Sequence, residues 1–137
     1  MDLKKEALTI LKESFVGTMA TVQQNKPYSR YMTFINDEFT LYTATSRQTE
    51  KVDELEVNPY THILIGYEGK GMGDEYLEIE GRVCISDDES MKEKVWNKHM
   101  KSWFSGPDDP DLVILKISPE LIRLMNKKGE KPKEITL

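Results

Sequence analysis

The chain has 137 residues, a length typical of one domain, and 38% of them are hydrophobic, which is enough for one packed core. Its 19 lysine and arginine residues are outnumbered by 24 aspartate and glutamate residues, and the net charge of −5 argues against a nucleic-acid partner. A single cysteine excludes an intrachain disulfide, and no apolar run approaches the ~20 residues of a membrane helix, so we expect a cytoplasmic protein without a membrane partner.

The first half of the chain predicts one helix and then a run of strands. Residues 1–14 have the apolar spacing of an amphipathic helix that ends near Glu13, with Asp2 placed as its N-cap. Alternating apolar residues then predict three strands joined by tight turns, at residues 16–22, 28–35 and 39–43. Two successive hairpins without a crossover helix predict an antiparallel sheet.

The second half combines helices with further strands. One helix is predicted over residues 48–57, and another runs from a cap at residues 87–89 through Trp103. Strands are predicted at residues 61–67, 76–86, 112–117 and 119–125. Residues 126–137 are predicted to form a polar tail. This order favours a closed or half-closed antiparallel barrel decorated by helices, as one domain over residues 1–137.

Several familiar motifs are missing from the sequence. The glycine-rich residues 69–73 lack the dinucleotide-binding spacing and precede a strand, so they are predicted to form a hairpin loop. His62 and His99 have no carboxylate at the spacing of a metal or hydrolase motif, so no metal site is predicted. Cys84 lies between two apolar residues in a strand pattern, and we expect a buried thiol there.

One group of residues indicates an anion site. Thr43, Thr45 and Ser46 lie where a strand ends and a helix begins, and Lys51 follows on that helix. The start of a helix has unpaired N–H donors and a partial positive charge, so hydroxyls and a lysine beside it suit a phosphate. The alternative is simple capping, because Thr45 and Gln48 have the spacing of a capping box.

Arg30 adds a second cation to this hypothesis. Strand alternation places it on the same face as the apolar residues Met32 and Phe34, where an uncompensated charge is costly. The next strand is predicted to pair with this one through a tight turn, which would bring Arg30 near Thr45 and Ser46. A phosphate would suit the guanidinium, and a surface ion pair with a glutamate is the alternative.

Four segments carry a resemblance to a known family. They are residues 15–22, 26–32, 41–51 with 58–59, and 103–112. Together, and in this order, they resemble the general stress protein group of the pyridoxamine 5′-phosphate oxidase-like, flavin-binding split-barrel family. The resemblance implies a mainly β fold with helices, a six-stranded antiparallel split barrel. It also implies a homodimer with two flavin sites at the subunit interface.

The same resemblance assigns roles to individual residues. The flavin phosphate would be bound by Arg30, Thr45, Ser46 and Lys51. The backbone along the flavin ring and ribityl chain would come from Ser29, Tyr31, Met32 and Thr43. Trp103 of the other subunit would lie at the rim of the site. The cofactor would be FMN, with FAD as the alternative.

Three functional hypotheses follow from this resemblance. The first is a flavin-dependent oxidoreductase of unknown substrate, which a nicotinamide or another small molecule would reduce. The second is a stress protein that binds or stores a flavin or haem without turnover. The third is an empty barrel that serves dimerisation and protein interaction. No residue of the chain is singled out as a catalytic acid or base.

Overall fold

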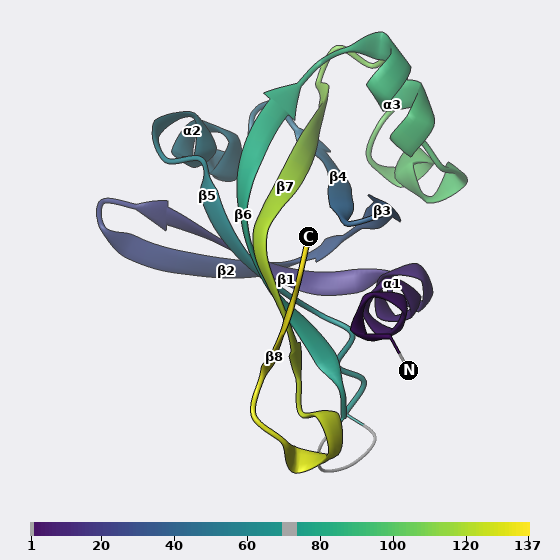
Figure 1. Cartoon of the computed structure of the whole chain (residues 1–137). Helices are drawn as coiled ribbons and strands as arrows, with labels where there is room; N and C mark the ends of the chain where they lie inside the picture. The colour runs from purple at the N-terminus through teal and green to yellow at the C-terminus, as the bar shows by residue number, and fades with distance from the viewer. Residues whose placement is uncertain (1, 70–73) are drawn as a thin grey trace.

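The computed structural model describes residues 2–69 and 74–137, apart from the side chain of Lys128. Within these residues, eight strands form one antiparallel sheet in the order β2-β1-β5-β6-β7-β4-β3, with β8 added beside β7. The sheet curls into a half-barrel, with α2 beside β1 and α3 beside β4 (Figure 1). The predicted antiparallel split barrel is confirmed, with eight strands in place of six.

The first helix, α1 (Leu3–Glu13), confirms the prediction for the N-terminal segment. The Asp2 carboxylate caps it by accepting a hydrogen bond from the backbone N–H of Lys4 at 2.9 Å. Ala7 and Leu11 are buried. The predicted apolar stripe is therefore the face that packs against the sheet.

The next two strands, β1 (Val16–Gln23) and β2 (Lys26–Thr33), form a hairpin. Gln24 and Asn25 have φ angles of 50° and 64°, the left-handed conformation that a tight two-residue turn requires. On its other side β1 pairs with β5 (Tyr60–Ile65). This leaves β2 at the edge of the sheet.

The second predicted hairpin is wrong over most of its length. Residues 28–35 split at Phe34 into the end of β2 and a separate strand, β3 (Ile35–Asp37). Phe34 is buried, and its N–H donates to the carbonyl of Phe15 at 2.8 Å, which continues the pairing with β1 in place of the predicted pairing with the next strand. As a result β4 (Thr40–Ser46) pairs with β3 over three residues on one edge and with β7 along its other edge, and it does not pair with β2.

A seam therefore separates β2 from β4, which are not neighbours in the described sheet. The hydroxyl of Thr43 on β4 donates to the carbonyl of Thr33 on β2 at 2.6 Å. This side-chain bond takes the place of a backbone ladder between the two strands. The half-barrel is open on either side of it.

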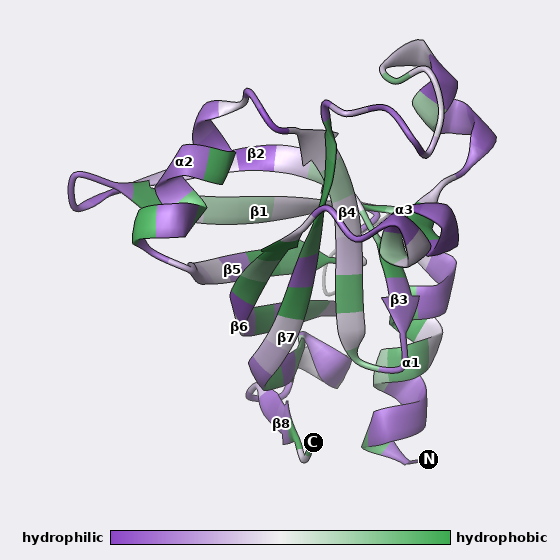
Figure 2. Cartoon of the chain, turned by 90° about the horizontal axis from the view of Figure 1, so that it is seen from above, coloured by the Kyte–Doolittle hydropathy of each residue, from purple (hydrophilic) through white to green (hydrophobic). Residues whose placement is uncertain are grey.

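The longest pair consists of β6 (Tyr76–Ser86) and β7 (Leu112–Met125), and hydrophobic and hydrophilic bands alternate along both (Figure 2). Two strands were predicted where β7 is continuous. Pro119 does not interrupt it, because Pro119 lies opposite Gly81 at a shift in register. A side chain at Gly81 would meet the carbonyl of Ser118 at 3.0 Å, so the close approach needs a glycine.

The predicted polar tail is tied to the fold at two points. It contains a short 3-10 helix, η2 (Lys127–Gly129), and a strand, β8 (Lys133–Ile135), which pairs with β7. Ile135 belongs to the hydrophobic core. The ammonium of Lys127 contacts both carboxylate oxygens of Glu6 on α1, at 2.7 and 2.8 Å.

The remaining helices are shorter than predicted. The second helix, α2 (Glu50–Val57), begins after a turn at residues 47–49 that follows β4. The single helix predicted after residue 87 is two elements, α3 (Glu89–Val95) and the 3-10 helix η1 (Lys98–Ser102). Asn97 separates them, since its side chain accepts a hydrogen bond from the N–H of His99 at 3.0 Å and so starts η1.

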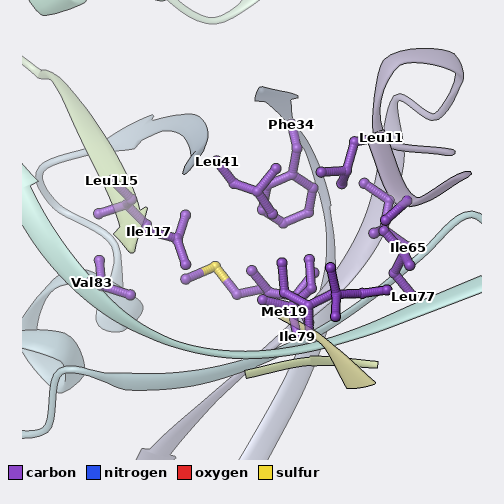
Figure 3. Packing of buried hydrophobic residues seen from close by; sticks show 14 of the residues in the cluster. Leu11, Met19, Phe34, Leu41, Ile65, Leu77, Ile79, Val83, Leu115 and Ile117 are labelled. Carbon is purple, nitrogen blue, oxygen red and sulfur yellow. The ribbon is translucent and has the colours of Figure 1, made fainter. Parts of the chain in front are cut away.

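The main hydrophobic core lies inside the curl of the sheet. Figure 3 shows Met19, Phe34, Leu41 and Ile117 pointing into a common interior. A smaller cluster lies between α3, η1 and the strands β4 and β7. Its buried members are Tyr42, Val95, Met100, Leu112 and Ile114.

Cys84 is exposed, so the predicted buried thiol is wrong. Burial alternates along β6, and Val83 occupies the inward position beside it. Cys84 therefore points to the opposite, outer face of the sheet.

Two further observations concern whole segments. The glycine-rich loop predicted at residues 69–73 lies, beyond Gly69, outside the described residues. None of the helices in the described part of the chain is both long enough and apolar enough to span a bilayer.

Candidate functional site

A cavity of about 660 Å³ opens along the seam between β2 and β4, a volume usual for small-molecule sites. Hydroxyl and charged residues gather where β4 leads into α2. We call this group the polar corner: Thr45, Ser46, Thr49, Lys51 and Asp111. Aromatic and imidazole rings also line the cavity. We call them the aromatic wall: Phe15, Tyr31, His99, Trp103 and Phe104.

Hydrogen bonds organise the polar corner from within. The hydroxyl of Ser46 donates to the carboxylate of Asp111 at 2.7 Å and accepts from the N–H of Gln48 at 3.2 Å. The predicted capping box of Thr45 and Gln48 does not form. The N-cap of α2 is instead Thr49, and no side chain bonds to the first turn of the helix. The start of α2 is thus left without a side-chain cap at the edge of the cavity.

Lys51 is the cation of this corner. It lines the cavity, is partly buried, and has no ion-pair partner within 4 Å among the residues that the structure describes. Burial lowers the pKa of its ammonium, the nearby Arg30 cation lowers it further, and Glu54 opposes both effects. A bound anion would offset the two effects that disfavour its charge.

Arg30 does not reach the residues that the sequence placed beside it. It is absent from the cavity lining, and its guanidinium donates to the hydroxyl of Thr21 at 2.7 Å and lies 3.5 Å from the carboxylate of Glu54. The predicted approach to Thr45 and Ser46 is wrong because β2 pairs with β1 and not with β4. The alternative is confirmed in that Arg30 pairs with a glutamate, but the carboxylate of Glu54 is buried and not at the surface.

Glu54 is a residue of this region that the sequence analysis missed. It lies on α2 with a side chain only 4% exposed, and it accepts a hydrogen bond from Thr21 at 2.5 Å. We call Thr21, Arg30, Lys51 and Glu54 the Glu54 cluster. The sequence held one signal for it, since Glu54 follows Lys51 by three residues and so shares its side of the helix.

The structure brings most of the other predicted site residues together. Seven of them line the cavity: Tyr31, Met32, Thr43, Thr45, Ser46, Lys51 and Trp103. Tyr31 and Trp103 are about four-fifths exposed, at 79% and 81%, so they form the outer rim of the aromatic wall. Ser29 is exposed on β2 and is not part of the lining.

Several lining residues were not predicted. Phe15 and His99 come together at an interplanar angle of 61°, with ring centroids 6.3 Å apart. This contact depends on the break at Asn97, which no helical periodicity reveals. Within the described residues, no cluster of three or more histidine, cysteine or acidic side chains is arranged to hold a metal ion.

Comparisons with known proteins agree with this architecture. A family model described as pyridoxamine 5′-phosphate oxidase matches residues 3–126. General stress protein 26 of Bacillus subtilis (strain 168) is 48% identical over 136 residues, which cover 99% of this chain and 97% of that protein. The crystal structure of General Stress Protein 26 from Bacillus anthracis str. Sterne superposes with a TM-score of 0.89 at 36% identity and full coverage of both chains.

More distant structures share the fold alone. A FAD-binding protein from Mesorhizobium loti has a TM-score of 0.72 at 21% identity, over 86% of this chain and 90% of that one. A heme binding protein from Mycobacterium smegmatis has a TM-score of 0.79 at 18% identity, over 97% of this chain and 57% of that one.

Proposed function

Because the chain belongs to the pyridoxamine 5′-phosphate oxidase family, in its general stress protein group, we propose that it is a flavoprotein that binds FMN in the cavity along the seam. FAD is the alternative, and a FAD-binding protein from Mesorhizobium loti shares the fold. The observation that carries the proposal is the pairing of an unpartnered, partly buried lysine with a wall of rings in one cavity.

The phosphate would bind in the polar corner. Lys51 supplies the charge, and the hydroxyl of Thr45 and the start of α2 supply hydrogen-bond donors. The Thr49 hydroxyl would first have to release the Ser46 carbonyl. Ser46 would have to release Asp111 before it could donate to a phosphate. Arg30 would act on the phosphate at a distance, through its positive charge near Lys51. It would contact the phosphate directly only if its guanidinium left Glu54.

The ring of the cofactor would lie against the aromatic wall. The backbone of Tyr31 and Met32 and the side chain of Thr43 border the same space. When bound, the flavin supplies electron transfer, and the protein supplies orientation and the electrostatic environment. We propose an oxidoreductase of this kind, reduced by a nicotinamide or another small molecule.

A homodimer would complete the site. Tyr31, Thr18 and Leu64 lie in one row across β2, β1 and β5, on the outer face of the sheet. Tyr31 and Leu64 are exposed there, and Val16 on the same face of β1 is 52% exposed. A second copy on this face would cover the rim of the cavity, and Trp103 would then contact the flavin of the other subunit.

A second candidate is haem binding without turnover. His99 lines the cavity, and a neutral imidazole is a common axial ligand of haem iron. A heme binding protein from Mycobacterium smegmatis has the same fold. Absorption spectra of the purified chain titrated with haem would show a shifted Soret band that His99→Ala abolishes. A titration without that shift would rule this candidate out.

To test flavin binding, the full chain is titrated with FMN and, separately, with riboflavin. Quenching of the flavin fluorescence reports the bound fraction. We expect FMN to bind more tightly than riboflavin, because only FMN carries the group for the polar corner. Stopped-flow mixing with NADH or NADPH then separates an enzyme from a storage protein. Equal affinity for the two flavins would contradict the assigned phosphate site, and binding of neither would contradict the function.

A further inference from the structure

A buried carboxylate stands beside the two cations that would attract a phosphate. Glu54 lies between the core residues Val52 and Leu55 on α2, and its side chain is 4% exposed. A carboxylate in such a position is costly unless it is paired, and an apolar residue would fit the helix face more cheaply. Its retention calls for an account of what it does.

Glu54 contacts Arg30 through one of its two carboxylate oxygens. Oε2 of Glu54 accepts from the hydroxyl of Thr21 at 2.5 Å, and the same oxygen lies 3.5 Å from Nη2 of Arg30. Nη1 of Arg30 donates to Thr21 at 2.7 Å and reaches the carbonyl of Met19 only at 3.5 Å. This single-oxygen contact is not the bidentate pair that ties an arginine firmly to a carboxylate. The geometry therefore fits charge compensation better than a purely structural tie.

The charges of the Glu54 cluster do not cancel. Arg30 and Lys51 are two cations, and Glu54 is the one carboxylate that acts on both of them. Asp111, the carboxylate on the other side of the polar corner, is bonded to Ser46. Within the Glu54 cluster one positive charge therefore remains, and removal of Glu54's charge would leave two, while Asp111 keeps its own negative charge on the other side of the polar corner.

We propose that Glu54 is a specificity-determining residue: its carboxylate offsets one of the two neighbouring cations, and so limits how strongly the cavity prefers a phosphorylated aromatic ligand to the unphosphorylated one. The class of ligand in this inference rests on the proposed function. The effect of the Glu54 charge applies to any ligand that carries a phosphate. A phosphate held by one uncompensated cation dissociates faster than one held by two. The bound ligand is thus kept exchangeable with free ligand.

The test is a charge series on the full chain. Glu54→Gln keeps an oxygen that accepts from Thr21 and keeps the side-chain shape, but it removes the negative charge. Arg30→Gln removes one cation, and the double variant Arg30→Gln with Glu54→Gln restores the wild-type balance. Glu56→Gln removes an equal charge from an exposed position of the same helix and serves as the control.

Each variant is titrated with inorganic phosphate, by thermal shift at constant ionic strength, and with FMN and riboflavin by fluorescence. We expect Glu54→Gln to bind phosphate and FMN about tenfold more tightly, with slower FMN release and unchanged riboflavin affinity. Arg30→Gln should bind phosphate about tenfold more weakly, and the double variant should return to wild type. The differences should shrink in high salt, and Glu56→Gln should match wild type.

The outcomes separate this inference from the proposed function. If the phosphate affinities follow the charge series but no flavin binds, the function is wrong and the role of Glu54 stands. If FMN binds and Glu54→Gln leaves its affinity unchanged or weaker, Glu54 is structural and the inference is overturned. Should Glu54→Gln fail to fold, the comparison of Arg30→Gln with the double variant decides, because a purely structural Glu54 predicts no recovery.

Discussion

Two clusters of arginine and glutamate lie on this sheet, and their charge balance is opposite. On the outer face, Arg123 of β7 contacts both Glu78 and Glu80 of β6, so one cation is shared by two carboxylates. Hydrogen bonds from Arg123 to these carboxylates hold the pKa of its guanidinium above its ordinary value. In the Glu54 cluster two cations share one carboxylate, and burial lowers the pKa of Lys51.

The difference shows which charges are available to a ligand. The Arg123 cluster has a surplus of acceptors at the protein surface, where such pairs contribute little and have no need of an added anion. The Glu54 cluster has a surplus of cations, and Lys51 in it lines the cavity. A bound anion would balance the charge of the Glu54 cluster. The Arg123 cluster needs no such anion, and the predictions below test this difference.

The largest effect is expected when both cations of the Glu54 cluster are removed. Arg30→Ala with Lys51→Ala eliminates the charge-assisted contact of Lys51, about 1.5–3 kcal/mol, and the field of the neighbouring Arg30, so FMN affinity should fall about a hundredfold. Riboflavin affinity should hardly change. Fluorescence titration measures both, and FMN affinity equal to that of wild type would mean that the phosphate lies elsewhere.

A smaller effect is expected from disruption of the outer face. Leu64→Arg places a charge in the row formed with Thr18 and Tyr31, so it should produce monomers and weaken FMN binding about tenfold. Sedimentation measures the first effect and fluorescence the second. Leu137→Arg, at another exposed apolar residue, should change neither. A monomer with full FMN affinity would show that one subunit makes the whole site.

Alkaline pH should change both the stability of the protein and its FMN affinity, through Lys51 of the Glu54 cluster. Because the pKa of Lys51 is lowered in the folded chain, the unfolded chain binds more protons between that pKa and the ordinary value of 10.5. The free energy of unfolding of the ligand-free protein should therefore rise with pH across this window, while FMN affinity falls as the ammonium is lost. Lys51→Arg should retain FMN at high pH, and urea titrations of Lys51→Met should lack the rise.

The smallest effect is expected in the Arg123 cluster. Arg123→Ala removes contacts at the surface of β6 and β7, at the opposite end of β7 from Leu112, which pairs with Ser46, so FMN affinity should stay within about twofold of wild type. Its thermal midpoint should fall slightly. A large loss of FMN binding in this variant would contradict the contrast between the two clusters.

Much of the fold could be predicted because burial in this chain follows strand alternation. The span of β6 was predicted to the residue, and the N-cap of α1 by Asp2 was also predicted. The same alternation should have placed Cys84 outward, since Val83 beside it faces the core. The prediction of a buried thiol is wrong because adjacent residues of a strand point to opposite faces, so apolar neighbours do not indicate that Cys84 is buried.

The errors arise where distant segments decide the local structure. The chain stays paired with β1 as far as Phe34, whose N–H donates to Phe15, and no local pattern encodes where that pairing stops. The break before η1 did have a signal in Asn97, but the spacing of large apolar residues concealed it. The pairing of Arg30 with Glu54 depends on how α2 packs against β1, so the sequence could offer only an unnamed glutamate as the partner.

The lone bond from Thr43 to Thr33 has a mechanical consequence. Where a ladder would distribute strain over many backbone amides, a single side chain here lets the two borders of the cavity separate at low cost. A ligand that contacts both β2 and β4 would hold the two borders of the cavity together. Amide hydrogens on both strands would then exchange more slowly in the presence of that molecule, even those distant from any direct contact with it.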